Sequence, residues 1–267
     1  MHVGISTASL YNRCMLEDAP ELFFGWGVSD AEYFLNSFCE YRPAFIDLLK
    51  QRTERYGLTV HNVHPMSSMF ESQLFSLHPR QREDAFRIFR SVLEAAKALS
   101  AKHYVMHGAA HMSGAAKNLE TERVAKTLDE LCTMAADYGV TIALENVSWC
   151  FYHRPEMALA FLDAMQTDLL HFTLDIKQAI RSGVDPCSII EAVGDRIDVL
   201  HVCDCDRSGE RPRYCLPPQG GYDIKGVVDA LLKKGFCGTV MLEAYSDMYT
   251  ELSELNDSYK ILKQLLK

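Results

Sequence analysis

Short apolar runs alternate with longer amphipathic segments along the whole chain. The runs that are typical of strands lie at residues 2–7, 31–37, 58–64, 103–108, 140–146, 170–175, 197–203 and 238–244. Successive runs are mostly separated by enough residues for a helix. This alternation is typical of a parallel β-sheet whose strands are joined by helical crossovers.

The helical pattern is clearest at residues 80–100 and 119–138. In the first segment, apolar side chains recur at steps of three and four: Phe86, Phe89, Val92, Leu93 and Ala96. The second segment ends at Tyr138-Gly139, and glycine is common directly after a helix. Eight strand–helix units in 267 residues predict an α/β protein with one domain over residues 1–267, a (β/α)8 TIM barrel.

A ligand-type side chain ends each of four successive strand-like runs: Glu145, Asp175, His201 and Glu243. Because the carboxyl ends of barrel strands meet at one mouth, we expect these four side chains to lie together. A leucine precedes each of them, and carboxylates beside an apolar wall need a positive charge nearby. Three carboxylates and one imidazole suit a single divalent cation, although one such residue alone is as often a solvated or salt-bridged group.

Composition narrows the classes of partner. The formal net charge is −9 and no basic patch stands out, which disfavours nucleic acid. No apolar run approaches the ~18 residues of a membrane span, and Met1–Ser6 resembles a strand more than a targeting signal. The nine cysteines are scattered, which is typical of reduced thiols and indicates a cytoplasmic protein.

Several motifs occur in an order that is specific as a set: Leu144-Glu-Asn146, Leu174-Asp175, Leu200-His201 followed by Asp204, Pro217–Ile224 and Leu242-Glu243. With these motifs the chain resembles the xylose isomerase-like TIM barrels over almost its whole length. That family includes tagatose/psicose 3-epimerases, inosose dehydratases and endonuclease IV. The resemblance implies that Glu145, Asp175, His201 and Glu243 bind one Mn, Mg, Co or Zn ion.

Three further residues match family positions near the metal or the substrate. His64 and His107 end the third and fourth strand-like runs, where the family has histidines. Arg207 matches an arginine that contacts substrate hydroxyls in the epimerases. Each also has a plainer interpretation, as a structural histidine or as a loop arginine in a salt bridge.

Other residues near the predicted mouth are less typical of the family. Gln178 stands where the family usually has histidine, and its amide is able to hold a substrate hydroxyl. Lys177 stands where glycine is common; it offers a cation to a substrate carboxylate or phosphate, or it is a solvated turn residue. Trp149 and Phe151 suit either a wall against a sugar ring or the core. Glu40 is a weaker candidate.

Two kinds of zinc site are disfavoured by the sequence, that of the endonuclease branch and a thiolate site. Arg213-x-Cys215 replaces a ligand pair of the endonuclease branch, which together with Gln178 and the negative charge disfavours DNA repair. Cys203-x-Cys205 with Cys215 lacks the second ligand pair of a thiolate zinc site, so small buried thiols are expected there.

The sequence thus predicts a metal-dependent isomerase or epimerase of a small sugar or polyol. Glu145 and Glu243 would move the proton through a metal-stabilised enediolate. One alternative is a lyase that expels a β-hydroxyl, as in inosose dehydratases, and another is a non-catalytic barrel that binds a metabolite. The absence of an evident phosphate loop favours an unphosphorylated substrate. A homo-oligomer is left open.

Overall fold

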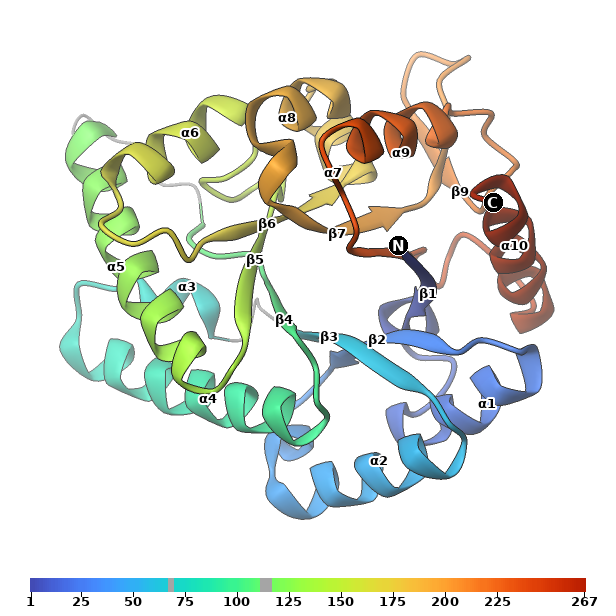
Figure 1. Cartoon of the computed structure of the whole chain (residues 1–267), viewed down its shortest axis with the longest axis horizontal. Coiled ribbons are helices and arrows are strands. Elements are labelled where there is room, and N and C mark those ends of the chain that lie inside the picture. The colour runs from blue at the N-terminus through green and yellow to red at the C-terminus, as the bar shows by residue number, and fades with distance from the viewer. Residues whose placement is uncertain (67–69, 111–116) are drawn as a thin grey trace.

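The structure is a computed structural model that describes residues 1–66, 70–110 and 117–267. Eight parallel strands close into a barrel in the order β1-β10-β7-β6-β5-β4-β3-β2. Figure 1 shows the strands inside a ring of helices. The barrel strands are β1 (His2–Ser6), β2 (Asp30–Leu35), β3 (Thr59–Pro65), β4 (His103–Met106), β5 (Thr141–Glu145), β6 (His171–Asp175), β7 (Ile197–Val202) and β10 (Thr239–Leu242). Each predicted strand overlaps one of these, and the predicted barrel fold is confirmed.

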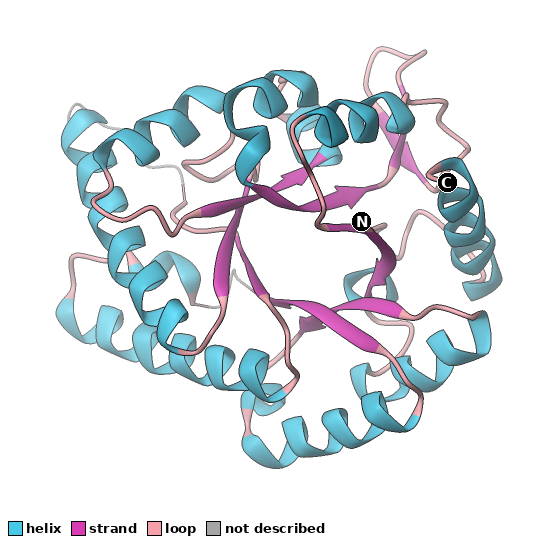
Figure 2. Cartoon of the chain, in the orientation of Figure 1, coloured by secondary structure: helices cyan, strands magenta, loops and turns pink. Residues whose placement is uncertain are grey.

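Helices form a ring outside the barrel (Figure 2). They are α1 (Ala19–Trp26), α2 (Pro43–Arg55), α3 (Glu71–Leu74), α4 (Pro79–Ala98), α5 (Lys117–Asp137), α6 (Pro155–Ala164), α7 (Ile176–Arg181), α8 (Pro186–Val193), α9 (Ile224–Lys233) and α10 (Leu252–Leu265). The apolar side chains that predict α4 are all buried, so this helix packs with the expected face toward the sheet. Among the described residues, no helix is long and apolar enough to cross a membrane.

A short antiparallel hairpin, β8 (Asp204–Asp206) with β9 (Arg213–Cys215), lies between β7 and α9 and was not predicted. It accounts for the long interval between His201 and Glu243. All nine cysteines are free thiols, and none of the candidate metal-ligand groups found in the described part of the chain contains a cysteine. Cys203, Cys205 and Cys215 are small buried side chains around this hairpin, as expected.

The interior of the barrel is unusually polar. Asn62 on β3 donates a hydrogen bond across the barrel to Thr239 Oγ1 on β10, at 3.1 Å, and a second one to Glu32 Oε2 on β2, also at 3.1 Å. Ser6 Oγ donates to Glu32 Oε1 at 2.8 Å. Branched aliphatic residues usually fill this space in TIM barrels. The polar filling instead forms a supporting floor beneath the side chains at the strand ends.

Candidate active site at the barrel mouth

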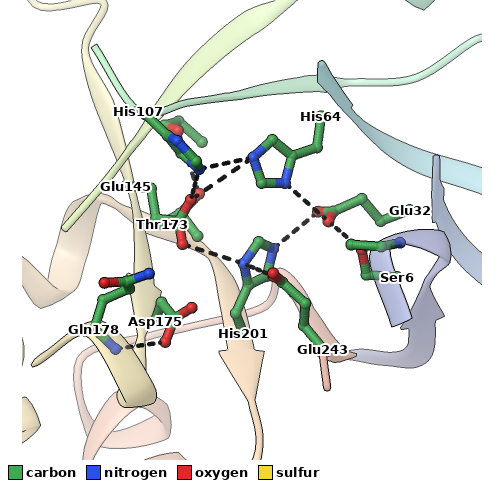
Figure 3. A network of polar contacts seen from close by, with 12 residues as sticks. Ser6, Glu32, His64, His107, Glu145, Thr173, Asp175, Gln178, His201 and Glu243 are labelled. Atoms are coloured by element: carbon green, nitrogen blue, oxygen red, sulfur yellow. Dashed lines mark hydrogen bonds and ion pairs between the residues drawn. The ribbon is translucent and has the colours of Figure 1, made fainter. Parts of the chain in front are cut away.

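The four strand-end residues meet at one point. Glu145 and Asp175 end β5 and β6, His201 lies on β7, and Glu243 follows β10. A ligand atom of each lies within 4.8 Å of a ligand atom of every other one, and each residue is at most 6% exposed. Figure 3 shows His201 between Glu145 and Glu243, with Asp175 beside them. The expectation that these side chains lie together is confirmed.

An asparagine ties the ends of β5 and β6 together. Asn146 donates from Nδ2 to the Asp175 carbonyl oxygen at 3.0 Å, and its Oδ1 accepts from the Asp175 amide at 2.7 Å. The Asp175 carboxylate also accepts from the Gln178 amide at 2.8 Å, which caps the start of α7. One oxygen of Asp175 is therefore occupied by the backbone, while Oδ2 is left facing the cluster.

His201 is held in place by a residue that the sequence analysis missed. Its Nε2 lies 3.0 Å from Glu32 Oε2, deep in the barrel. Its Nδ1 faces the cluster, 3.6 Å from Glu145 Oε1 and in contact with Glu243 Oε2. A carboxylate behind a histidine places the ring proton on that side and turns the other nitrogen's lone pair outward, an arrangement typical of metal sites. The sequence offered one sign of this role, since Glu32 is a charged residue inside a predicted strand.

The two predicted mouth histidines both reach the cluster. His107 Nε2 lies 2.9 Å from Glu145 Oε2 and 3.0 Å from His64 Nε2. His64 Nδ1 in turn lies 3.6 Å from Glu32 Oε1. Glu71 fixes the turn after β4, since its Oε2 accepts from the His107 amide at 2.9 Å and from the Gly108 amide at 3.1 Å. His64, His107 and Glu145 therefore form a second group of potential ligands beside the first.

The carboxylates differ in their acidity. Burial alone would raise the pKa of Glu145 and of Glu243. His107 and His201 outweigh it at Glu145, and His201 and Lys177 outweigh it at Glu243, so both pKa values are lowered. Burial, with the charges of Glu145 and Glu243, raises the pKa of Asp175 to about 6 in spite of Lys177. Burial would lower the pKa of His201, yet the charges of Glu243 and Glu32 raise it well above its usual value. The three carboxylates of the cluster lie close together and attract positive charge.

The interpretation of Lys177 as a solvated turn residue is wrong, because its side chain is 1% exposed. The first turn of α7 directs it inward, where Nζ lies 3.6 Å from Asp175 Oδ2 and 3.8 Å from Glu243 Oε1. Nζ also lies 3.8 Å from the centre of the Tyr245 ring. A lysine is rarely buried unless it is paired, so two carboxylates and one aromatic face account for its position.

The remaining candidates lie at different distances from the cluster. Gln178 is buried, and its Oε1 accepts from the Ser148 amide at 3.2 Å. Trp149 is half-exposed, with its ring 5.8 Å from that of His107, so it lies at the mouth. Arg207 is exposed in the loop after β8, and the structure records no contact between it and the cluster within the described ranges. Glu40 instead binds the Asn36 amide near the end of β2.

Phe151, the other aromatic considered for the mouth, is 5% exposed and belongs to the main hydrophobic core. Its amide donates to the Ala109 carbonyl oxygen at 2.9 Å, which connects the loops after β4 and β5. The interpretation as a core residue is therefore the correct one. Among the two aromatics, only Trp149 is exposed enough to contact a ligand at the mouth.

A divalent cation fits the chemistry of the cluster. His201 Nδ1 and Glu243 Oε2 are shielded from solvent and lie against each other, without another hydrogen-bond partner among the described residues. Glu145 Oε1 lies 3.6 Å from the same nitrogen, and buried polar atoms that lack hydrogen bonds are costly. A mixed set of carboxylates and one imidazole suits Mn, Mg, Co or Zn. The ligand atoms of the cluster therefore suit a divalent metal ion.

Asp204 organises the loop that leads into α9. Its carboxylate accepts a hydrogen bond from the Cys205 amide at 2.7 Å and three from this loop, from the amides of Gly220 at 2.8 Å, Gly221 at 3.2 Å and Tyr222 at 2.9 Å. The loop is packed so closely that a Cβ on Gly220 would lie 2.5 Å from the backbone of Cys205. This explains the glycine-rich Pro217–Ile224 motif as a structural element beside β7, close to the cluster.

Comparison with protein-family models gives one match. The model described as xylose isomerase-like TIM barrel matches residues 21–265. An inosose isomerase of Bacillus velezensis is 27% identical over 174 residues, which are 62% of this chain and 61% of that protein. A fructoselysine 3-epimerase of Escherichia coli O157:H7 is 22% identical over 210 residues, covering 74% and 72% of the two chains. The match to the inosose isomerase thus spans less than two thirds of that protein.

Solved structures agree on the fold. A D-psicose 3-epimerase with D-tagatose from Clostridium cellulolyticum H10 superimposes with a TM-score of 0.82 at 18% identity, and all of both chains is covered. An IOLI protein with a bound zinc atom has a TM-score of 0.80 at 20% identity, covering 99% of this chain and 96% of that one. Likeness at these identities extends to the barrel and not to the reaction.

Proposed function

The chain belongs to the xylose isomerase-like TIM barrel family, and we propose that it is a divalent-metal-dependent isomerase or epimerase of a small sugar or polyol. One observation carries the proposal: three carboxylates and one imidazole from four strand ends converge within 4.8 Å, deep in the mouth of the barrel. The relatives named as an inosose isomerase and a fructoselysine 3-epimerase support the same class of reaction.

In this proposal Glu145, Asp175, His201 and Glu243 hold the ion. Glu32 keeps the ring proton of His201 on Nε2, so that the lone pair of Nδ1 is free to bind the metal. The ion supplies Lewis acidity, which makes a C–H bond next to a carbonyl more acidic and stabilises negative charge on oxygen. The polar floor formed by Ser6 and Asn62 fixes Glu32 and with it the imidazole. The metal ligands therefore rest on a rigid base.

Glu145 and Glu243 are the proposed proton carriers. They come from β5 and β10, which are separated by β6 and β7 in the barrel, so they approach a substrate from two sides. Neighbouring positive groups, histidines at Glu145 and His201 with Lys177 at Glu243, lower the pKa of both carboxyl groups, which keeps them in the ionised form that a proton acceptor needs. One removes the proton from carbon and the other returns it to the neighbouring carbon or to the opposite face.

The mouth residues are proposed to position the substrate. His64 and His107 present imidazoles beside Glu145, Trp149 offers an apolar surface, and Gln178 lies at the start of α7. Arg207, which is exposed in the loop after β8, is proposed to contact substrate hydroxyls. Lys177 lies against the proposed metal ligands and is considered separately below.

The test combines metal content with proton exchange. We expect about one divalent ion per wild-type chain and a clear reduction in Glu145→Ala. With the correct ketose in deuterium oxide, the wild type should incorporate deuterium at carbon and Glu243→Gln should not. An absence of metal after reconstitution with Mn, Mg, Co or Zn would exclude the proposal. Loss of water from the substrate would identify a lyase instead.

A further inference from the structure

The ammonium group of Lys177 is the most unusual charge in the cluster. It is sealed from solvent and makes no hydrogen bond to any described residue. Its two nearest carboxylate oxygens, at 3.6 and 3.8 Å, are beyond the usual length of a hydrogen bond. The ammonium therefore acts on its surroundings through charge, and an uncompensated charge in such a place would be very costly.

The two carboxylates beside Lys177 belong to the proposed ligand set. Asp175 turns Oδ2 toward the ammonium, since its Oδ1 already accepts the amide of Gln178. Glu243 turns Oε1 toward the ammonium, while its Oε2 contacts His201. Lys177 thus faces the Asp175 oxygen that is free for an ion and the Glu243 oxygen that does not contact His201, and the Tyr245 ring contributes a further attraction from 3.8 Å.

The charges of the site can be counted from these contacts. Among the proposed ligands, Glu145, Asp175 and Glu243 contribute three negative charges when they are ionised, one more than the positive charge of a divalent ion. The charge of Glu32 is not counted with them, because this carboxylate faces the imidazoles of His201 and His64. Lys177 supplies the remaining positive charge. Charges a few ångströms apart in a buried site interact strongly, because little water screens them. The ammonium therefore repels a metal ion held by these ligands and attracts negative charge that forms there.

We propose that Lys177 is a fixed counter-charge of the metal centre, which weakens the binding of the divalent ion and stabilises the negative charge formed on the substrate during proton transfer. This inference rests on the proposed function above. Lys177 keeps its proton throughout: the carbon-bound proton passes to a glutamate, and the electron pair moves from the C–H bond toward the substrate oxygen. Lys177 takes no part in proton transfer and acts only through the electrostatic effect of its positive charge.

The test measures metal affinity in the chelator-stripped protein, independently of turnover. Titration with Mn²⁺ should show binding about tenfold tighter or more in Lys177→Met than in the wild type. Lys177→Arg keeps the charge and should stay close to the wild type. Lys225→Met, which removes a lysine paired with Asp229 on the outside of α9, is the matched control and should not change the affinity.

The proposal also requires the two effects of Lys177 to separate. In Lys177→Met with saturating Mn²⁺, deuterium exchange into the substrate should be slower than in the wild type although the ion is held more tightly. Lys177→Gln gives a second neutral variant if the methionine variant does not fold, with circular dichroism melting as the check. Metal binding that is unchanged or weaker in the neutral variants would overturn the inference alone. A wild type that binds no metal would overturn the proposed function as well.

Discussion

Glu32 and His201 are 169 residues apart, yet Glu32 Oε2 lies 3.0 Å from His201 Nε2 across the interior of the barrel. The pair joins β2 to β7, which are not neighbours in the sheet. Both side chains are almost fully buried. The position of the imidazole is therefore set by the barrel floor and not only by the strand that carries it.

Glu32→Gln should weaken divalent metal binding while the barrel stays folded. Glutamine has nearly the same shape, but it has no negative charge to hold the Nε2 proton of His201. Loss of such a partner typically costs about 10–100-fold in metal affinity. Calorimetric titration with Mn²⁺ would measure the change. Glu40→Gln is the matched control, because Glu40 binds the Asn36 amide outside the cluster; equal effects in both variants would contradict the role of Glu32.

Asn146→Ala should destabilise the mouth of the barrel. The change removes both hydrogen bonds to the Asp175 backbone and leaves a buried amide and carbonyl without partners. We expect the free energy of unfolding in urea to fall by about 2–4 kcal/mol. Asn256→Ala on α10 is the control, since Asn256 Oδ1 makes no hydrogen bond in the described structure. A comparable loss of stability in the control would show that the two hydrogen bonds of Asn146 do not stabilise the fold.

The strand-end residues of the cluster could be predicted because their placement follows from local pattern and one topological rule. Each strand could be recognised from its apolar run, and the closure of a barrel brings the carboxyl ends together. The residue type at each end then indicated the chemistry. Glu145 and Asp175, for example, needed no knowledge of contacts between distant residues.

Glu32 and Lys177 could not be predicted in the same way. The role of Glu32 depends on which strands face each other across the barrel, and Glu40, the weaker candidate that the sequence offered on this part of the chain, lies elsewhere. Lysine is mostly exposed in proteins, so the sequence left two interpretations of Lys177 open, a solvated turn residue or a cation offered to the substrate. Lys177 is buried because the first turn of α7 directs its side chain inward. The β8–β9 hairpin has strands of three residues, too short for any periodicity.

Gly220→Ala should disturb the loop that Asp204 holds. A Cβ at this position would lie 2.5 Å from backbone atoms of Cys205 and 2.7 Å from Asp204 Oδ1, and that carboxylate is held by hydrogen bonds from four backbone amides. Overpacking of this kind costs about 1–3 kcal/mol of stability. Gly209→Ala, whose nearest contact would be 3.8 Å away, is the control for thermal unfolding. Equal melting temperatures would refute the close packing of the loop.

The last prediction concerns the amino-terminal end of the barrel, away from the cluster. Asp30 Oδ1 lies 2.6 Å from His61 Nε2 and 3.1 Å from His2 Nδ1, and Ser29 donates to Oδ2 at 2.6 Å. Burial would raise the pKa of Asp30, but the hydrogen bonds from His61 and Ser29 outweigh it and lower the pKa to about 2.

A carboxyl group with a pKa below its unfolded value stabilises the fold above that unfolded value, and the stabilisation is lost as the pH falls through the folded pKa. The ordinary value for Asp30 is 3.8. Asp30→Asn should therefore be less stable than the wild type at about pH 7, and the difference should shrink steadily from about pH 4 to about pH 2. Urea unfolding at each pH measures it, with the exposed Asp47→Asn as control. A difference that stays constant across this range would mean that the charge of Asp30 does not stabilise the barrel.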